Sequence, residues 1–373
     1  MNLHERILER LSEIEAKNLK RALVSPRGID LSSNDYLGLA KDARLKNAMI
    51  EGVLREGVGS TGSRLLRGER DCFREVERQF AAWKNSERAL YFNSGYQANI
   101  GVLQTFPENG DVVFSDEFNH ASLIDGIRLS KCRKIIFRHL DFENLSELLR
   151  KTECEGQKFL VTESLFSMDG DIAPLEKYAE ICLETNTNLI VDEAHAVGVY
   201  GEKGSGLIEE FGIESDVFLS INTAGKALGV AGAFVAGSDS AIEYLIQKAR
   251  AFIFSTAPVP AIANALIAAI EIAAHHTERR DNLLRLSKFL REKLNENGIE
   301  VSPDNSQIIP IIIGESEKAV RIAGNLQAKN FDVRAIRPPT VPENTSRLRV
   351  SLNANLTEKI LEDFVAALKE ELK

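Results

Sequence analysis

The sequence contains few of the residues on which disulfide-rich domains and metal sites depend. Its four cysteines are Cys72, Cys132, Cys154 and Cys182, and no pair has the C-x-x-C spacing of a zinc or redox motif. We expect them to be scattered, reduced thiols and predict no metal site. A chain of 373 residues can bury a large core without disulfides or structural metals.

Long apolar runs and an excess of basic charge are also missing. The most apolar stretch, 257–274, predicts a buried helix and no membrane span, because two prolines, an asparagine and a glutamate interrupt it. The 46 basic residues face 55 acidic ones, for a formal charge of -9, which argues against nucleic acid as the main partner. Residues 1–17 predict a charged amphipathic helix and no signal peptide. The expected class is a cytoplasmic globular enzyme.

Seven short apolar runs, rich in β-branched or aromatic residues, alternate with helical patterns in the middle of the chain. They are 88–92, 111–114, 134–137, 159–162, 188–191, 217–220 and 232–235. Continuous apolar runs separated by helices are typical of a parallel sheet covered on both faces. The sequence therefore predicts an α/β fold with a seven-stranded, mostly parallel sheet.

The pattern changes toward the C-terminus. A helical stretch from about Pro260 to Leu294 precedes three predicted strands, and Thr357 is a plausible N-cap for a last helix with an apolar stripe. The predicted strands are 307–313, 332–336 and 348–352. We expect a helical arm, a large domain and a smaller α+β domain, with bounds 1–31, 32–275 and 276–373.

Ligands of such sheets bind beyond the carboxyl ends of the strands, where Lys226 and Asp192 follow apolar runs. A lysine among small residues at a strand end can form a Schiff base with a carbonyl; the alternative is a surface lysine in a loop. A carboxylate at a buried strand end needs a cation such as a protonated pyridine nitrogen. The alternative is a helix-capping Asp192 beside a core His195.

Two further segments follow strands. The residues 93–99 should open a helix whose backbone N–H groups hold a phosphate, and Gly95 permits close approach. The dinucleotide and nucleotide-triphosphate fingerprints are absent, so this segment alone also fits an ordinary helix start. His120 fits a residue that stacks on a flat ring and equally fits a structural histidine. In this order on one sheet, the four features describe a pyridoxal phosphate site.

The sequence resembles the α-oxoamine synthases, a branch of the fold-type I pyridoxal phosphate transferases, over nearly its whole length. The similar motifs are SSNDYLGLA (32–40), GSTGSRLLRG (59–68), FNSGYQAN (92–99), DEFNHASLIDG (116–126), ESLFSMDGDIAPL (163–175), DEAHAVGVYGEKGSG (192–206), TAGKALG (223–229), FSTAPVP (254–260) and IRPPTVPENTSRLRVSL (336–352). Residues 69–72 depart from the usual family pattern. The resemblance implies a homodimer with active sites at the subunit boundary.

The resemblance also implies roles for single residues. Lys226 would hold the cofactor and then act as acid and base at the substrate Cα, and Asp192 would keep the pyridine nitrogen protonated. The remaining cofactor contacts would come from His195 and Ser167 at the ring 3-oxygen, His120 on the ring face, and the Gly95 and Tyr96 backbone with the Thr223 hydroxyl at the phosphate.

Substrate contacts are expected in other segments. Arg349 would bind the amino acid carboxylate through a bidentate fork, with Arg347 on the same strand face as the competing choice. Asn34 would lie near that carboxylate. Thr340 would contact substrate and Arg21, in the N-terminal arm, would help to bind the acyl donor. The proline pair before Thr340 also fits a rigid turn between strands.

The segment around Thr340 resembles the branch of the family that condenses L-alanine with a pimeloyl thioester, on CoA or on acyl carrier protein, in biotin biosynthesis. The expected products are 8-amino-7-oxononanoate, carbon dioxide and free thiol. The alternative within the family is the acylation of glycine by acetyl-CoA to 2-amino-3-oxobutyrate. A non-catalytic binding protein with this fold is disfavoured by the intact Lys226, Asp192 and His195 set. A cysteine desulfurase is disfavoured because no cysteine lies in a recognisable mobile-loop motif.

Overall fold

The computed structural model describes residues 1–17, 19–303 and 306–373. Its contacts divide the chain into two compact units. The large unit comprises residues 35–167 and 171–281, and the small unit comprises 1–34, 168–170 and 282–373. The expected domain bounds stay a prediction.

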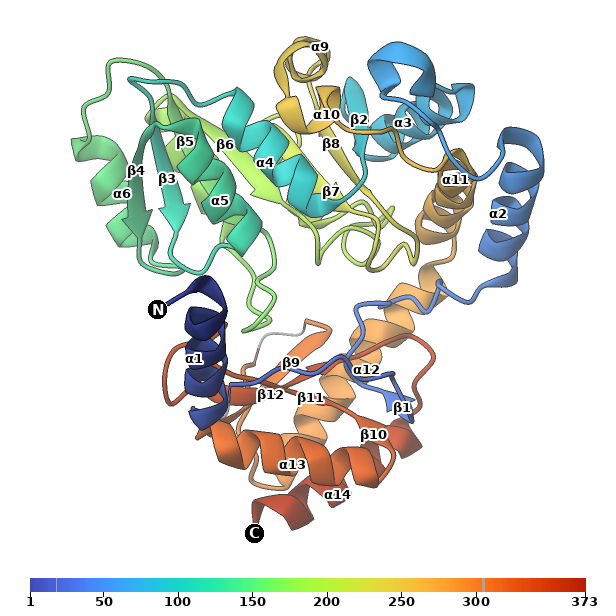
Figure 1. Ribbon diagram of the computed structural model, residues 1–373, viewed down its shortest axis with the longest axis vertical. Coiled ribbons are helices and arrows are strands. Elements are labelled where there is room, and N and C mark those ends of the chain that lie inside the picture. The colour runs from blue at the N-terminus through green and yellow to red at the C-terminus, as the bar shows by residue number, and fades with distance from the viewer. Residues whose placement is uncertain (18, 304–305) are drawn as a thin grey trace. The chain divides into compact units, whose positions relative to one another are not determined.

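A seven-stranded sheet forms the centre of the large unit (Figure 1). Its strands are β2 (Arg88–Phe92), β3 (Val112–Asp116), β4 (Arg133–Phe137), β5 (Lys158–Glu163), β6 (Thr187–Asp192), β7 (Val217–Thr223) and β8 (Ala233–Gly237). They lie in the order β2-β8-β7-β6-β5-β3-β4, and β3 to β7 pair in parallel. Every residue of β3 is buried, which requires cover on both faces. The predicted sheet is confirmed.

Strand β8 runs against this direction and pairs antiparallel with β7 and β2. The tight connection from Thr223 to Ala233 explains this direction, because a parallel crossover needs a dozen or more residues. One consequence matters for chemistry: the carboxyl ends of β5, β6 and β7 meet at one edge, at Glu163, Asp192 and Thr223.

Helices cover the sheet and fill the space between it and solvent. In the large unit they are α2 (Ala43–Glu56), the π-helical turn η1 (Arg64–Gly68), α3 (Asp71–Trp83), α4 (Gly95–Thr105), α5 (Ala121–Ser130), α6 (Phe142–Lys151), α7 (Leu175–Glu184), α8 (Leu207–Glu210), α9 (Asp239–Lys248), α10 (Arg250–Ile253) and α11 (Pro260–His275). A buried apolar cluster joins the sheet to α4, α5, α9 and α10 through side chains such as Val102, Ile127, Ile190 and Leu245. Full burial of each such side chain contributes about 1.5–3 kcal/mol.

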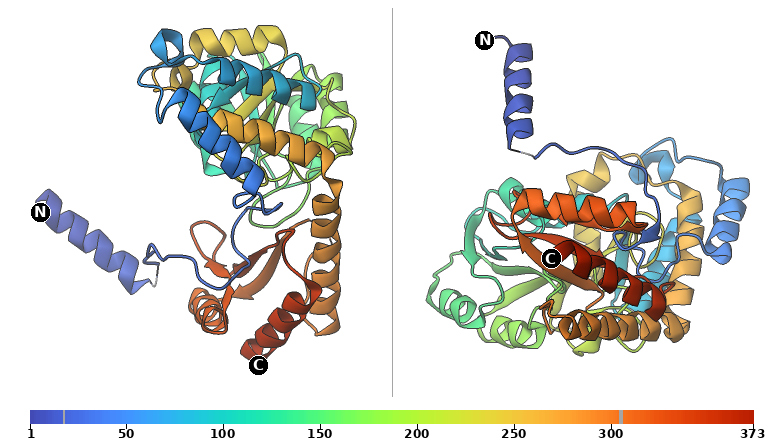
Figure 2. Two further views of the ribbon diagram at one scale, coloured as in Figure 1. Left: turned by 90° about the vertical axis from the view of Figure 1, so that its right-hand side faces the viewer. Right: turned by 90° about the horizontal axis from the view of Figure 1, so that it is seen from below.

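The small unit contains a three-stranded sheet in the order β11-β12-β9, with α13 and α14 packed beside it (Figure 2). Its strands are β9 (Ile308–Gly314), β10 (Phe331–Asp332), β11 (Arg334–Ile336) and β12 (Ser346–Ser351), and its helices are α1 (Leu3–Ala16), α13 (Ser316–Ala328) and α14 (Glu358–Leu372). β1 (Ile29–Asp30) pairs with β10, which attaches the N-terminal arm. Thr357 caps α14 as predicted. The Pro338–Pro339 peptide bond is cis.

The helical stretch expected from Pro260 to Leu294 is two helices and not one. α11 ends at His275, and α12 (Thr277–Glu296) begins after His276, whose backbone angles of φ -101° and ψ 72° are not helical. The boundary between the two units falls within α12. In the described part of the chain, each helix is too short or too polar to cross a membrane.

Candidate active site at the carboxyl edge of the large sheet

Lys226 lies in a closed turn directly after β7. Hydrogen bonds from Ala224 N to Gly232 O (2.9 Å) and from Val230 N to Ala224 O (3.1 Å) close this turn. The Lys226 Nζ atom is 2.8 Å from His195 Nε2. The opposite ring nitrogen of His195 is 2.6 Å from the Tyr36 hydroxyl, which is fully buried. The lysine is therefore partly buried and paired with an oriented imidazole, as a reactive amine requires.

Asp192, the last residue of β6, is held by two donors. Its Oδ2 accepts from Asn99 Nδ2 at 2.8 Å and its Oδ1 accepts from the Ala194 backbone N–H at 2.9 Å. Asn99 lies on α4 and also donates to Ser122 Oγ at 2.8 Å. Both Asp192 and Asn99 are buried, so the carboxylate has a fixed direction and suits a cationic partner.

His120 caps the N-terminus of α5. Its backbone N–H donates to Glu163 Oε1 at 2.6 Å, and its Nδ1 lies 2.7 Å from Ser122 Oγ. Burial lowers the pKa of His120, which favours the neutral ring. Burial and the nearby Asp192 charge raise the pKa of Glu163 to about 8. A neutral, anchored imidazole is suited to stacking on a ring.

The helix α4 begins at Gly95, immediately after β2. A Cβ atom at this position would lie 2.7 Å from Thr223 Oγ1, so only glycine leaves the helix start open beside that hydroxyl. Ser94 caps the helix by accepting from Gln97 N at 3.3 Å. The Tyr96 side chain points elsewhere and donates to Asp125, which leaves its backbone for a ligand. Free helix N–H groups beside a hydroxyl fit a phosphate.

Ser167 lies in the turn between Leu165 and Ile172, which form an isolated β-bridge. The preceding residue, Phe166, donates its backbone N–H to Asp171 O at 3.0 Å. The large unit thus contains Lys226, Asp192, His195, His120, Gly95, Tyr96, Thr223 and Ser167. Its charged, stacking and phosphate-binding groups fit pyridoxal phosphate.

The small unit brings together two of the predicted substrate residues. Arg349 donates from Nη2 to Asn34 Oδ1 at 3.1 Å and from Nη1 to Ser351 Oγ at 2.8 Å. Its competitor Arg347 pairs with Asp169 and donates to Met168 O at 3.2 Å. Arg347 therefore fixes a loop, and Arg349 is the better candidate for a carboxylate ligand.

Arg21 and Thr340 line one groove of about 560 Å³ in the small unit. Its wall includes Lys20, Arg334 and Arg337, and none of the described residues that line it is acidic. Apolar side chains from the arm, α13 and β11 complete the lining. In a chain with net charge -9, such a groove fits an anion that carries an apolar chain.

Two residues of the site were not predicted as functional. Tyr36 lies inside the quoted segment 32–40, and Asn99 inside 92–99, but neither follows a strand directly. The sequence does contain a signal for Asn99. It lies four residues after Gly95, on the same face of a helix that must pack against the sheet. A buried amide at that position needs a hydrogen-bond partner.

Comparisons with known proteins show the family to which the chain belongs. Residues 26–368 match the model of the family described as aminotransferase class I and II. The 8-amino-7-oxononanoate synthase of Lysinibacillus sphaericus is 42% identical over 91% of this chain and 87% of its own length. The enzyme of the same name from Anaeromyxobacter dehalogenans is 42% identical over 96% of this chain and 93% of its own length.

Solved structures are similar over most of the chain. The 8-amino-7-oxononanoate synthase of Francisella tularensis has 33% identity and a TM-score of 0.81, and covers 92% of this chain and 98% of its own. The serine palmitoyltransferase of Sphingomonas wittichii has 28% identity and a TM-score of 0.93, and covers 100% and 98%. The chain belongs to the aminotransferase class I and II family and, within it, to the α-oxoamine synthases.

Proposed function

We propose that this enzyme condenses L-alanine with a pimeloyl thioester, on CoA or on acyl carrier protein, to form 8-amino-7-oxononanoate in biotin biosynthesis. The alanine carboxyl leaves as carbon dioxide and the carrier leaves as free thiol. The observation that carries the proposal is the Lys226–His195–Tyr36 chain beside the oriented Asp192. Relatives at 42% identity are named for the product, 8-amino-7-oxononanoate.

Pyridoxal phosphate, when bound, supplies an electron sink that stabilises negative charge at the alanine Cα. Lys226 removes the Cα proton and later returns one. Asp192, held by Asn99, would keep the pyridine nitrogen protonated. His120 would pack against the ring, and Ser167 and His195 would bind its 3-oxygen. The Gly95 and Tyr96 N–H groups and the Thr223 hydroxyl would hold the phosphate.

We assign the alanine carboxylate to Arg349 and Asn34, which already share a hydrogen bond. The acyl donor is assigned to the groove of Arg21 and Thr340, whose cations attract an anionic carrier or the terminal carboxylate of the chain. Both assignments lie within the small unit. The cofactor residues lie within the large unit.

The proposed assembly is a cytoplasmic homodimer. Several large apolar side chains are exposed. They are Leu54 on α2, Val58 just after α2, Leu66 on η1 and Phe254 just after α10. Exposed apolar side chains of this size are typical of surfaces that a second copy covers. Sedimentation at low and high protein concentration tests the dimer.

Thiol release from the cofactor-loaded enzyme tests the reaction. Pimeloyl-CoA with L-alanine is compared with acetyl-CoA and glycine, and with palmitoyl-CoA and L-serine. We expect release with the first pair alone and no turnover after Lys226→Ala. Release with either other pair alone would overturn the substrate assignment, and turnover by K226A would overturn the assignment of Lys226.

A further inference from the structure

His139 lies two residues after β4 and bridges two carboxylates. Its Nδ1 is 2.9 Å from Asp116 Oδ1, at the end of β3, and its Nε2 is 2.9 Å from Asp171 Oδ2. The His139 side chain is 14% exposed and that of Asp116 is 0% exposed. Because a carboxylate accepts hydrogen bonds, both ring nitrogens must carry a proton, and the ring is a cation.

The surrounding charges favour this state. Burial alone would lower the pKa of His139, but the two carboxylates outweigh it and raise the pKa to about 10. Glu117 accepts the His139 backbone N–H at 2.8 Å. On the same segment, Arg138 pairs with Asp141, and α7 brings the buried Tyr178 ring against the neighbouring Phe137. Acidic groups thus dominate around the imidazole.

On one side, the bridge fixes the loop that leads to His120. Asp116 also accepts the Phe118 N–H at 2.8 Å and the Leu140 N–H at 3.2 Å. The Phe118 ring stacks on His139 with centroids 4.5 Å apart. Asn119 N donates to Asp116 O at 3.2 Å. The backbone is therefore held at each step between Asp116 and His120.

On the other side, the bridge fixes the turn that carries Ser167. The Phe166 ring meets the His139 ring edge-on, with centroids 4.5 Å apart, and Phe166 N donates to Asp171 O at 3.0 Å. His139 thus contacts both the residue before Ser167 and the aspartate that closes the turn. Through hydrogen bonds at both of its ring nitrogens, His139 joins the two loops.

We propose that His139 is a positioning residue, a cationic clasp that holds the His120 loop and the Ser167 turn in the geometry that the cofactor ring requires. The inference rests on the proposed function for its link to catalysis. It predicts that loss of the clasp disturbs the ring contacts without removing any residue that touches the cofactor.

Two measurements on the full-length, cofactor-loaded enzyme test the clasp without any acyl substrate. Nuclear magnetic resonance of the six histidines, assigned by loss of one signal in His139→Gln, should show His139 doubly protonated at about pH 8, where a histidine with a pKa near 6.5 is neutral. The visible band of the bound cofactor should shift in H139Q and stay unchanged in the matched control His275→Gln, at an exposed position on α11.

Kinetics then tests the link to catalysis. We expect H139Q to lower kcat about 10- to 100-fold, as misplacement of catalytic groups does, with little change in the KM for alanine. In the double variant with His120→Asn, the losses should be less than multiplicative, because both changes act through the same ring contact. H275Q should retain wild-type kcat.

The outcomes are separable. A neutral His139 at about pH 8 would overturn the clasp. An unchanged cofactor band and an unchanged kcat in H139Q would also overturn it, even if that variant were less stable, because His139 would then have a structural role only. If H139Q does not fold, Asp171→Asn is measured in the same way, because it removes one of the two carboxylates that His139 contacts. An unchanged cofactor band in D171N would also overturn the clasp. Lack of thiol release by the wild type would overturn the proposed function alone.

Discussion

Glu193, which lies between Asp192 and His195 in the sequence, forms an ion pair with Lys84. The side chains of Lys84 and Glu193 are 2% and 0% exposed. Lys84 Nζ also donates to Ser205 O at 2.7 Å, and Glu193 accepts from Ile208 N at 2.9 Å. A pair so completely desolvated contributes little net free energy, but the loss of one partner leaves an uncompensated charge.

Lys84→Met should therefore destabilise the protein by about 3–5 kcal/mol, measured by urea denaturation. The double variant K84M/E193Q should recover part of this loss, because no buried charge is left unpaired. Lys151→Met, which breaks the exposed pair with Glu147, is the matched control and should change stability little. Equal losses in K84M and the double variant would contradict the argument.

The Asn99 side chain donates a hydrogen bond to the Asp192 carboxylate. Asn99→Ala should weaken pyridoxal phosphate binding about 10- to 100-fold, since loss of a hydrogen bond to a charged group costs about 1.5–3 kcal/mol. Fluorescence titration of the apoenzyme measures the affinity. Asn325→Ala, at an exposed position on α13 where the amide donates to Glu371, should bind the cofactor as the wild type does.

His139 also predicts a pH dependence of stability. Because its folded-state pKa of about 10 lies above the ordinary value of 6.5, its charged form stabilises the fold. This stabilisation is fully present below about pH 6.5 and declines as the pH rises through 10. The difference in unfolding free energy between wild type and H139Q should shrink over this range. A difference that stays constant from pH 6.5 to 10 would contradict it.

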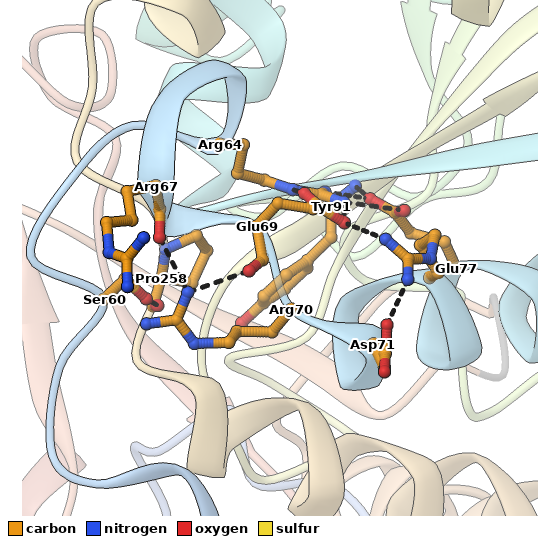
Figure 3. Close-up of polar contacts among 10 residues, drawn as sticks. Ser60, Arg64, Arg67, Glu69, Arg70, Asp71, Glu77, Tyr91 and Pro258 are labelled. Atoms are coloured by element: carbon orange, nitrogen blue, oxygen red, sulfur yellow. Dashed lines mark hydrogen bonds and ion pairs between the residues drawn. The ribbon is translucent and has the colours of Figure 1, made fainter.

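At the level of elements, the buried guanidinium of Arg64 connects η1 to its neighbours (Figure 3). Arg64, in η1, is 7% exposed at its side chain and pairs with Glu69 and Glu77. Burial raises the pKa of Glu77, and the Arg64 charge opposes this. Glu77 also accepts the Tyr91 N–H at 2.8 Å, so Arg64 connects η1 to α3 and β2.

Arg64→Ala should loosen the segment around η1 and destabilise the protein by about 3 kcal/mol or more. Trypsin should then cleave after Arg67 and Arg70 faster than in the wild type, because local opening exposes the backbone there. Arg78→Ala removes an exposed arginine that pairs with Glu75 on the same helix and should leave cleavage after Arg67 and Arg70 unchanged. Peptide mass spectrometry identifies the cut sites.

The sequence predicts these elements unequally, for physical reasons. The strands β3 to β7 were predictable because buried parallel strands are continuous apolar runs. The direction of β8 was not, since periodicity carries no information on pairing. The break at His276 was missed because no proline or glycine marks it. Lys226 and Asp192 were predicted because Asp192 ends β6 and Lys226 lies three residues after β7. Asn99 contacts Asp192, 93 positions away, and His139 contacts Asp116 and Asp171, which spacing along the chain does not reveal.

At the scale of the whole molecule, the residues assigned to the cofactor and to the substrates are divided between two units. The eight residues proposed to bind the cofactor lie in the large unit, whereas the proposed substrate residues Arg21, Asn34, Thr340 and Arg349 lie in the small unit. Each ligand should therefore stabilise its own unit first, because a ligand stabilises the structure to which it binds.

Hydrogen exchange with mass spectrometry tests this division. Pyridoxal phosphate at 100 times its Kd should slow exchange through opening of its site up to about 100-fold, at 95–105, 192–208 and 224–232 in the large unit. The β12 strand should respond to added L-alanine instead, and Arg349→Lys should abolish that response while leaving the effect of the cofactor intact, since lysine lacks the fork that binds a carboxylate bidentately. Protection of β12 by the cofactor alone, with no response of the large unit, would contradict the assignment of the two sets of residues.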